Sequence, residues 1–180
     1  MTSRQRPLVV LVGPPGAGKT TVAALLAERL GTDVRDTDAD VEAAVGATIA
    51  DYFVDAGEPA FRVEEAAAVR TALAEHPGVL ALGGGAVLDA RTRAYLAGHT
   101  VVFLDVGIAE AASRVGLNTA RPLLLGNVRS QMKALMDARR PVYEAVASHV
   151  VLTDGLTPAE AAEHVMRVLG MSPTEEDTSS

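Results

Sequence analysis

The sequence predicts one α/β domain, a three-layer sandwich in which helices flank a parallel sheet. Short apolar runs of β type alternate with longer segments of helical pattern along the 180 residues, which is typical of βαβ units. No internal repeat or linker divides residues 1–170. The stretch "MSPTEEDTSS", residues 171–180, is polar and acidic, and we expect it to be a disordered tail.

Five strands are predicted from short apolar runs bounded by turn residues. Aromatic residues make up only 3% of the chain, so we expect a core built from Ala, Val and Leu. The predicted strands are Leu8–Val12, Asp33–Asp36, Val79–Leu82, Thr100–Asp105 and His149–Thr153.

The first helices are predicted from the glycines that end them. A helix over Lys19–Leu30 is followed by Gly31, and a helix near Ala90–Ala97 is followed by Gly98. Glycine is the residue most often found just past a helix C-terminus, because it adopts the left-handed conformation without strain. Both segments therefore have defined C-terminal ends.

The later helices have signals of a different kind. Thr157, Pro158 and Glu160 form a capping box with Pro in the first turn, which predicts a last helix over about 158–169. The stretch "VRSQMKALMDAR" also reads as a helix and is expected to end just before Pro141.

The composition excludes several partners and chemistries. Lys and Arg number 16 against 23 Asp and Glu, a formal net charge of −7, which argues against nucleic acid or an anionic membrane as a partner. Any anionic substrate must therefore be held by a few placed cations. The chain has no Cys, so disulfides and thiol catalysis are excluded, and its four His lack the spacing of a zinc site.

The N-terminal region gives an expectation of location. Its apolar run, "LVVLV", is too short for the core of a signal peptide or for a membrane span. We therefore expect a cytoplasmic protein with no membrane partner. No self-complementary apolar face is apparent in the sequence, which favours a monomer.

The stretch "GPPGAGKT" matches the phosphate-binding pattern G-x-x-x-x-G-K-[ST] in full, between a strand and a helix. Glycines allow backbone N–H groups to turn inward around phosphate oxygens, and the helix adds its positive dipole end. Lys19 is expected to reach the β- and γ-phosphates, and the Thr20 hydroxyl to ligate Mg²⁺. The predicted nucleotide-binding residues are Gly13, Pro14, Pro15, Gly16, Ala17, Gly18, Lys19, Thr20 and Thr21.

A glycine-rich turn without a ligand is the structural alternative, and the complete motif in this context argues against it. The chain lacks the Asn-Lys-x-Asp guanine motif and the Asp-x-x-Gly switch of GTPases. Motor and transporter ATPases are usually larger. A chain this short favours a small-molecule kinase.

Two carboxylates follow the second predicted strand, at the sheet edge where open α/β folds bind ligands. Asp36 and Asp38 would point the same way in an extended segment, one towards Mg²⁺ and one towards an acceptor hydroxyl. Asp40 is expected in the first turn of the next helix. Two alternatives remain open: all three acids merely cap that helix, or Asp105, at the end of "VVFLD", is the carboxylate linked to magnesium.

The candidate cations each have a structural explanation. Arg62 lies on a predicted helix with Glu58 and Glu65 at helical spacing, which favours ordinary surface ion pairs. Arg139 and Arg140 end their helix, where cations complement the dipole. Arg121 lies in "GLNTARPLLLG", a stretch rich in turn residues, as in a lid that carries an arginine towards a phosphate.

Six segments together resemble the shikimate kinase family, within the nucleoside monophosphate kinase-like P-loop proteins. They are "GPPGAGKTT", "DTDADVE", "TIADYFVDAGEPAFRVEE", "LALGGGAV", "NTARPLL" and "ARRPVY", in the family's order and approximate spacing. The resemblance extends from Leu8 to about Val168. It implies strand order 2-3-1-4-5 and Mg²⁺-dependent transfer of phosphate from ATP to the 3-hydroxyl of shikimate, towards chorismate and the aromatic amino acids.

The resemblance also implies roles for residues at the acceptor side. Asp38 would hold the acceptor hydroxyl and act as its base or orienter, and Asp36 would lie in the outer sphere of the magnesium ion. Arg62 and Arg139 would clamp the shikimate carboxylate, as suits a planar anion with two oxygens. Gly83–Gly85 would line the shikimate pocket, where backbone can approach only if no Cβ intrudes.

Further implied features concern the nucleotide. Arg121 would swing over the phosphates on a lid at about 114–126, Arg114 would lie near the adenine, and residues of about 37–65 would form the substrate-binding helical region. The last strand–helix connection, "LTDGLTPAE", has no cation, unlike that of many family members. Adenine would then be held less tightly, or by backbone and Arg114 alone.

Other functions share this framework. A gluconate kinase or nucleoside monophosphate kinase has a similar size and fold, and a nucleotide-binding scaffold without turnover is an alternative from another class. The intact Lys19, Thr20, Asp36, Asp38 and Arg121 argue against the scaffold, since a degenerate site should have lost at least one of them.

Overall fold

The structure is a computed structural model that describes residues 6–114 and 122–172. Its five-stranded sheet is parallel throughout and has the order β2-β3-β1-β4-β5, which confirms the predicted fold class. Each predicted strand is present, with ends that differ by at most one residue. The strands are β1 (Val9–Val12), β2 (Val34–Asp36), β3 (Val79–Ala81), β4 (Val101–Asp105) and β5 (His149–Leu152).

The register brings the carboxyl ends of the strands to one edge. In the central strand β1, Leu11 pairs with Ala81 of β3 and with Val102 of β4. Asp36, the last residue of β2, pairs with the same Ala81. The segments that follow β1, β2 and β3 therefore emerge side by side, and these segments carry the phosphate-binding motif, the acidic pair and the three glycines.

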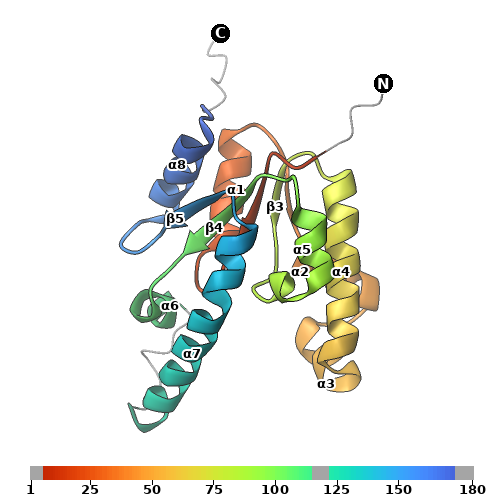
Figure 1. Ribbon diagram of the computed structural model, residues 1–180, viewed down its shortest axis with the longest axis vertical. Helices are drawn as coiled ribbons and strands as arrows, with labels where there is room; N and C mark the ends of the chain where they lie inside the picture. Colours follow the sequence, from red (N-terminus) through yellow and green to blue (C-terminus); the bar gives the residue numbers. More distant parts are fainter. Residues whose placement is uncertain (1–5, 115–121, 173–180) are drawn as a thin grey trace.

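Helices cover both faces of the sheet (Figure 1). On one face lie α1 (Lys19–Arg29) and α8 (Pro158–Leu169), and on the other α4 (Glu58–Glu75), α5 (Ala90–Leu96) and the C-terminal part of α7 (Pro122–Val146). The remaining elements are α2 (Thr37–Val45), α3 (Ile49–Ala56), the short 3₁₀ helix η1 (Ala86–Leu88) and α6 (Ile108–Arg114). Figure 1 shows α3 and the N-terminal half of α7 extending beyond the sheet at the same end of the molecule.

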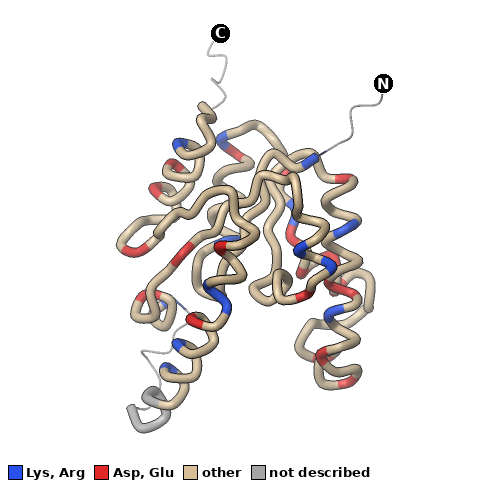
Figure 2. Tube along the Cα trace, in the orientation of Figure 1, with Lys and Arg blue, Asp and Glu red and all other residues tan. Residues whose placement is uncertain are grey.

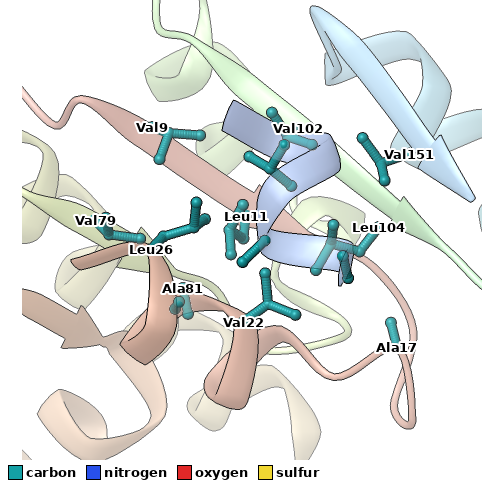
Figure 3. Close-up of a cluster of buried hydrophobic side chains, with 14 of the residues drawn as sticks. Val9, Leu11, Ala17, Val22, Leu26, Val79, Ala81, Val102, Leu104 and Val151 are labelled. Carbon is teal, nitrogen blue, oxygen red and sulfur yellow. The ribbon is translucent and has the colours of Figure 1, made fainter. Parts of the chain in front are cut away.

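The core is built from aliphatic residues, as expected. Alternate residues of β1 point to opposite faces: Val9 and Leu11 pack in one cluster and Val10 and Val12 in the other. Figure 3 shows the first cluster, where side chains of the sheet meet Val22 and Leu26 of α1. This packing fixes α1, and hence the loop before it, against the centre of the sheet.

The predicted ends of the last helix are confirmed. Thr157 accepts from the Glu160 N–H, the Glu160 carboxylate accepts from the Thr157 N–H, and Gly170 ends the helix with a left-handed φ of 66°. Within the described ranges, none of the helices is long and apolar enough to cross a membrane.

The prediction that a helix ends before Pro141 is wrong, because α7 continues through Pro141 to Val146. Proline removes one intrahelical hydrogen bond, but its fixed φ is compatible with a helix. The turns beyond it bury apolar area: Tyr143 is 1% exposed and stacks on Phe103 of β4 at a centroid distance of 5.0 Å. This burial offsets the hydrogen bond that Pro141 cannot make.

Charged residues of both signs are interspersed along the outer helices (Figure 2). The net charge of −7 is therefore not concentrated as a single acidic face in that view. The net charge of the chain does not show whether a particular arginine near the carboxyl edge of the sheet can bind an anion, because each arginine has its own neighbouring carboxylates. The residues that surround each arginine decide it.

Candidate active site

The phosphate-binding loop links β1 to α1, and three of its glycines, Gly13, Gly16 and Gly18, have a positive φ. At Gly13, where φ is 154°, a Cβ would lie 2.5 Å from the carbonyl oxygen of Leu104 in β4. Gly18 has a φ of 85° and forms the N-cap of α1. The loop can therefore turn tightly against the sheet and direct the start of α1 towards a bound anion.

Lys19 lies over this loop. Its Nζ donates to the carbonyl oxygens of Gly13 at 2.7 Å and of Pro14 at 3.1 Å. Burial lowers the pKa of Lys19 to about 8, and the nearby carboxylates of Asp38 and Asp36 oppose that change. The amine is thus held at the loop with only protein oxygens and two carboxylates to balance its charge, an arrangement suited to phosphate oxygens.

The acidic pair is arranged differently from the prediction. Asp36 ends β2 and caps α2, with its Oδ1 accepting from the Asp38 N–H at 2.9 Å, so Asp38 lies in the first turn of a helix and not in an extended segment. The Asp36 Oδ2 accepts from the Thr20 hydroxyl at 3.3 Å. The capping turn, and not strand alternation, brings the two carboxylates to the phosphate loop. Asp40 lies in the same first turn, as predicted.

Thr20 and Asp36 form an oxygen pair that fits Mg²⁺. In the described part of the chain, no group of three or more His, Asp or Glu side chains could hold a metal alone. Mg²⁺ is commonly bound by one or two protein oxygens together with substrate phosphates. The hydroxyl and carboxylate beside the loop therefore match a magnesium ion that arrives with a nucleotide.

The three glycines after β3 provide space for side chains from other elements. None of them has a positive φ, so backbone freedom does not explain them. A Cβ at Gly83 would lie 2.5 Å from Asp38 Oδ1 and 3.0 Å from Glu65 Oε2, and one at Gly85 would lie 2.5 Å from Arg62 Nη2. Two carboxylates and a guanidinium therefore converge over this segment.

Gly84 holds two further elements in contact. A Cβ there would lie 3.0 Å from the Pro15 ring of the phosphate loop. Its carbonyl oxygen accepts from the Tyr143 hydroxyl of α7. The glycine segment is thus packed between the phosphate loop and α7, and its own atoms form a floor at the carboxyl edge of the sheet.

Arg62 makes the predicted ion pairs, but it is not a surface residue. It donates to Glu65 at 2.7 Å and to Glu58 at 3.3 Å, and its side chain is only 16% exposed. Glu65 is 2% exposed, and burial raises its pKa in spite of the Arg62 guanidinium. Sequence reasoning missed Glu65 as a site residue, although its spacing of three from Arg62 was the available signal.

Asp38 lies between the lysine and this ion pair. Burial and the neighbouring Asp36 charge raise the pKa of Asp38, whereas the Lys19 and Arg62 cations lower it. A carboxylate with a raised pKa, close to the lysine of the loop, is suited to accept a proton from a hydroxyl group.

The two adjacent arginines of α7 have different surroundings. Arg140 pairs with Asp105 of β4, so this carboxylate, the rival candidate for the magnesium site, is already engaged. Arg139 acts electrostatically on both Lys19 and Tyr143. Its Nε is buried without a hydrogen-bond partner among the described residues, which leaves a donor for an anion.

The main cleft, of about 650 Å³, runs from Asp38 and Gly84 past the phosphate loop to α8. At the far end of the cleft, Arg114 was predicted as a site residue, and the other lining residues were not. Arg114 donates to the Gly16 carbonyl at 3.1 Å. The other lining residues at this end are Thr153, Leu156, Thr157, Pro158 and Ala161.

The predicted lid overlaps two helices at its described ends. Of residues 114–126, Arg114 ends α6, and the segment from Pro122 onward belongs to α7, with proline in its first turn. Residues 115–121, which include Arg121, lie outside the described residues, as do residues 173–180 of the predicted acidic tail.

The chain is similar to known proteins over almost its whole length. A family model described as shikimate kinase matches residues 15–170. The shikimate kinase of Thermobifida fusca is 58% identical over 164 residues, which cover 91% of this chain and 95% of the relative. The shikimate kinase of Streptomyces coelicolor is 63% identical over 157 residues, covering 87% of this chain and 92% of the relative.

Among solved structures, the chain is similar to the shikimate kinase from Acinetobacter baumannii in complex with shikimate. The TM-score is 0.82 with 34% sequence identity, and the match covers 91% of this chain and 92% of that chain. The shikimate kinase from Aquifex aeolicus matches with a TM-score of 0.73 and 27% identity, over 90% of this chain and 95% of that chain.

Proposed function

The chain belongs to the shikimate kinase family, and we propose that the cleft at the carboxyl edge of its sheet transfers the terminal phosphoryl group of ATP to shikimate. The protein is thus an ATP-dependent phosphotransferase that forms shikimate 3-phosphate in the biosynthesis of aromatic amino acids. Each end of the cleft then has its own substrate, with the nucleotide along the phosphate loop and the acceptor over the glycine segment.

The phosphate loop, Gly13 to Thr21, binds the phosphates of ATP through its backbone N–H groups, and the Lys19 amine neutralises charge on the β- and γ-phosphates. Mg²⁺, when bound, supplies further positive charge at the transferring group. Thr20 would ligate the ion, and Asp36 would hold it through water. The bond between the Thr20 hydroxyl and the Asp36 carboxylate supports this pairing.

Asp38 orients the acceptor hydroxyl and takes its proton as the new phosphate ester forms. This role is supported by its position between Lys19 and the Arg62–Glu65 pair, and by the direction in which burial moves its pKa. Of all the features of the cleft, this position of Asp38 supports the proposal most directly.

Arg62 and Arg139 bind the carboxylate of shikimate, and Gly83–Gly85 form the floor beneath it. Arg62 of α4 lies against Gly85, and Arg139 lies on α7 four residues before Tyr143, whose hydroxyl donates to the Gly84 carbonyl. Glu65 fixes Arg62 by its 2.7 Å bond. A guanidinium presents two parallel N–H donors to a carboxylate, which suits this anion better than a point charge does.

The far end of the cleft receives the adenine, against Arg114 and the residues around Pro158. Arg121, by resemblance to the family, covers the phosphates. We also propose that the protein acts as a cytoplasmic monomer without nucleic-acid or membrane partners. Size-exclusion chromatography with light scattering tests the monomer, for which we expect the chain mass of 18.6 kDa.

The first experiment is ADP release with MgATP against shikimate, quinate, gluconate, AMP and CMP. Activity with shikimate alone, and the 3-phosphate as product, is the expected outcome. Activity with another acceptor would retain the phosphate-loop chemistry and contradict the pocket assignment. Binding of ATP without turnover on any acceptor would instead favour the scaffold.

A further inference from the structure

The far end of the cleft, which we call the base end because the adenine base would bind there, contains a reciprocal pair of hydrogen bonds. They join the segment after β4 to the loop after β5. The N–H of Gly107, after β4, donates to Asp154 Oδ1 at 2.8 Å, and the N–H of Gly155, after β5, donates to Glu110 Oε2 at 2.7 Å. A Cβ at Gly107 would lie 2.7 Å from Asp154 Oδ2. The loop after β5 therefore supplies the Asp154 carboxylate to the backbone before α6, and the first turn of α6 supplies the Glu110 carboxylate to the backbone of that loop.

The second oxygen of Glu110 is also engaged. Its Oε1 accepts from Arg114 Nη2 at 2.7 Å. The Gly155 N–H and the Arg114 guanidinium together hold the pKa of Glu110 below its usual range. Glu110 is consequently a carboxylate at neutral pH, and both of its oxygens accept hydrogen bonds. One accepts from Arg114 of the same helix, and the other accepts from Gly155 of the neighbouring loop.

Arg114 extends this connection to the phosphate loop and to β5. Its Nη1 donates to the Gly16 carbonyl and to Thr153 Oγ1, both at 3.1 Å, and its Nη2 donates to the Thr153 carbonyl at 2.9 Å. These partners fix the plane of the guanidinium. A guanidinium held in this way is a preorganised surface for stacking on a planar base.

We propose that Glu110 and Asp154 are positioning residues that set the affinity of the cleft for the adenine end of ATP. The inference rests on the proposed use of ATP by this cleft. The loop after β5 carries no cation between Thr153 and Ala161, so Arg114 is the cation that this loop receives from outside. Neither carboxylate lines the cleft, and each acts through the groups it holds.

The proposal predicts effects on nucleotide binding and not on the chemical step. Ordering the two loops before the nucleotide arrives removes part of the entropic cost of binding. Loss of that order weakens ground-state and transition-state binding equally, so the KM for ATP rises while kcat is retained. The KM for shikimate should be unchanged.

Conservative substitutions distinguish the two carboxylates. Both Glu110 oxygens accept hydrogen bonds, one from Arg114 and one from the Gly155 N–H. Glu110→Gln keeps one acceptor oxygen and places an amide NH₂ group against the other donor, so that one of the two hydrogen bonds is lost. We expect it to raise the KM for ATP by about fivefold. Asp154 uses one oxygen on a backbone N–H, which Asn reproduces. Asp154→Asn should therefore stay within about twofold of the unchanged protein, while Asp154→Ala should match Glu110→Gln.

Asp137→Asn is the control, since it removes an exposed ion pair with Lys133 that has the same i,i+4 spacing as Glu110–Arg114. An unchanged KM for ATP in Glu110→Gln, or an equal effect on kcat or on the KM for shikimate, overturns the inference. Calorimetric titration with ADP provides a readout without an acceptor. If the unchanged protein fails to phosphorylate shikimate, the proposed function fails, and the ADP affinities of the same variants still decide the inference.

Discussion

Two arginines, Arg62 beside the glycine segment and Arg114 at the far end of the cleft, each pair with a glutamate of their own helix, in different surroundings. Arg62 pairs with Glu65 three residues along α4, and their side chains are 16% and 2% exposed. Arg114 pairs with Glu110 four residues back along α6, and their side chains are 26% and 31% exposed. The Arg62–Glu65 pair at the acceptor end is thus more deeply buried than the Arg114–Glu110 pair at the base end.

The difference changes what each pair contributes. Burial raises the pKa of Glu65, whereas hydrogen bonds lower the pKa of Glu110. Removing one partner of a buried ion pair leaves an uncompensated charge and lowers the free energy of unfolding strongly. An exposed ion pair contributes little to that free energy. The Glu65 pair is therefore expected to support both fold and site, and the Glu110 pair to support geometry alone.

Asp38→Asn tests whether the acceptor end carries the chemistry. The amide cannot take the proton of the acceptor hydroxyl, so kcat for shikimate should fall by about 10²- to 10⁴-fold. The base end is untouched, and the affinity for ADP should be retained. Steady-state kinetics measure kcat, and nucleotide titration measures the affinity for ADP. A kcat within a few-fold of that of the unsubstituted protein would show that Asp38 is not the catalytic carboxylate.

Glu65→Ala and Glu110→Ala compare the two pairs directly by thermal unfolding. Glu65→Ala leaves the partly buried Arg62 without its closest partner and should cost about 3 kcal/mol of unfolding free energy. For a chain of this size that corresponds to a melting temperature lower by about 6–12 °C. Glu110→Ala should shift it by less than about 2 °C. Equal shifts would show that burial is not the difference that matters.

Arg139→Ala tests the carboxylate clamp, with Arg140→Ala as its neighbour control. Loss of a bidentate cation should raise the KM for shikimate by about tenfold or more and change kcat less. Arg140 is engaged by Asp105, and its removal should leave that KM unchanged. If the two variants behave in the opposite way, the clamp belongs to Arg140.

The smallest effect concerns stability and pH. Burial and the Asp36 charge raise the pKa of Asp38 above its ordinary value of 3.8, so the folded state binds this proton more tightly than the unfolded state. Stability is therefore lost as pH rises through the raised pKa. Asp38→Asn should melt about 1–2 °C higher than the unchanged protein at neutral pH, and the gain should shrink as pH falls. A lower melting temperature at neutral pH would contradict this reasoning.

Features determined by local sequence could be predicted. The strands, the phosphate loop and the capping box of α8 depend on residues within a few positions of each other, and the structure agrees with them. The prediction failed where tertiary contacts compete with a local rule. Pro141 is expected to end a helix, but the burial of Tyr143 against the sheet favours its continuation.

The candidate site was predictable as a set of residues and not as an arrangement. The pairing of Arg62 with two glutamates follows from helical spacing, but its burial depends on where α4 meets the glycine segment. Glu65 and Pro158 were missed as site residues because an ordinary helical ion pair and the first turn of a helix explain them without a ligand. Their place at the cleft comes from long-range packing.

The glycine floor has a consequence for how this pocket can change over generations. A single methyl group at Gly83 displaces Asp38, at Gly84 it meets the rigid ring of Pro15, and at Gly85 it displaces Arg62. Each of these replacements alone disturbs a different part of the machinery. A mutational path towards a new acceptor is therefore expected to begin on the movable side chains above, since a replacement in the floor shifts a group of the site at once.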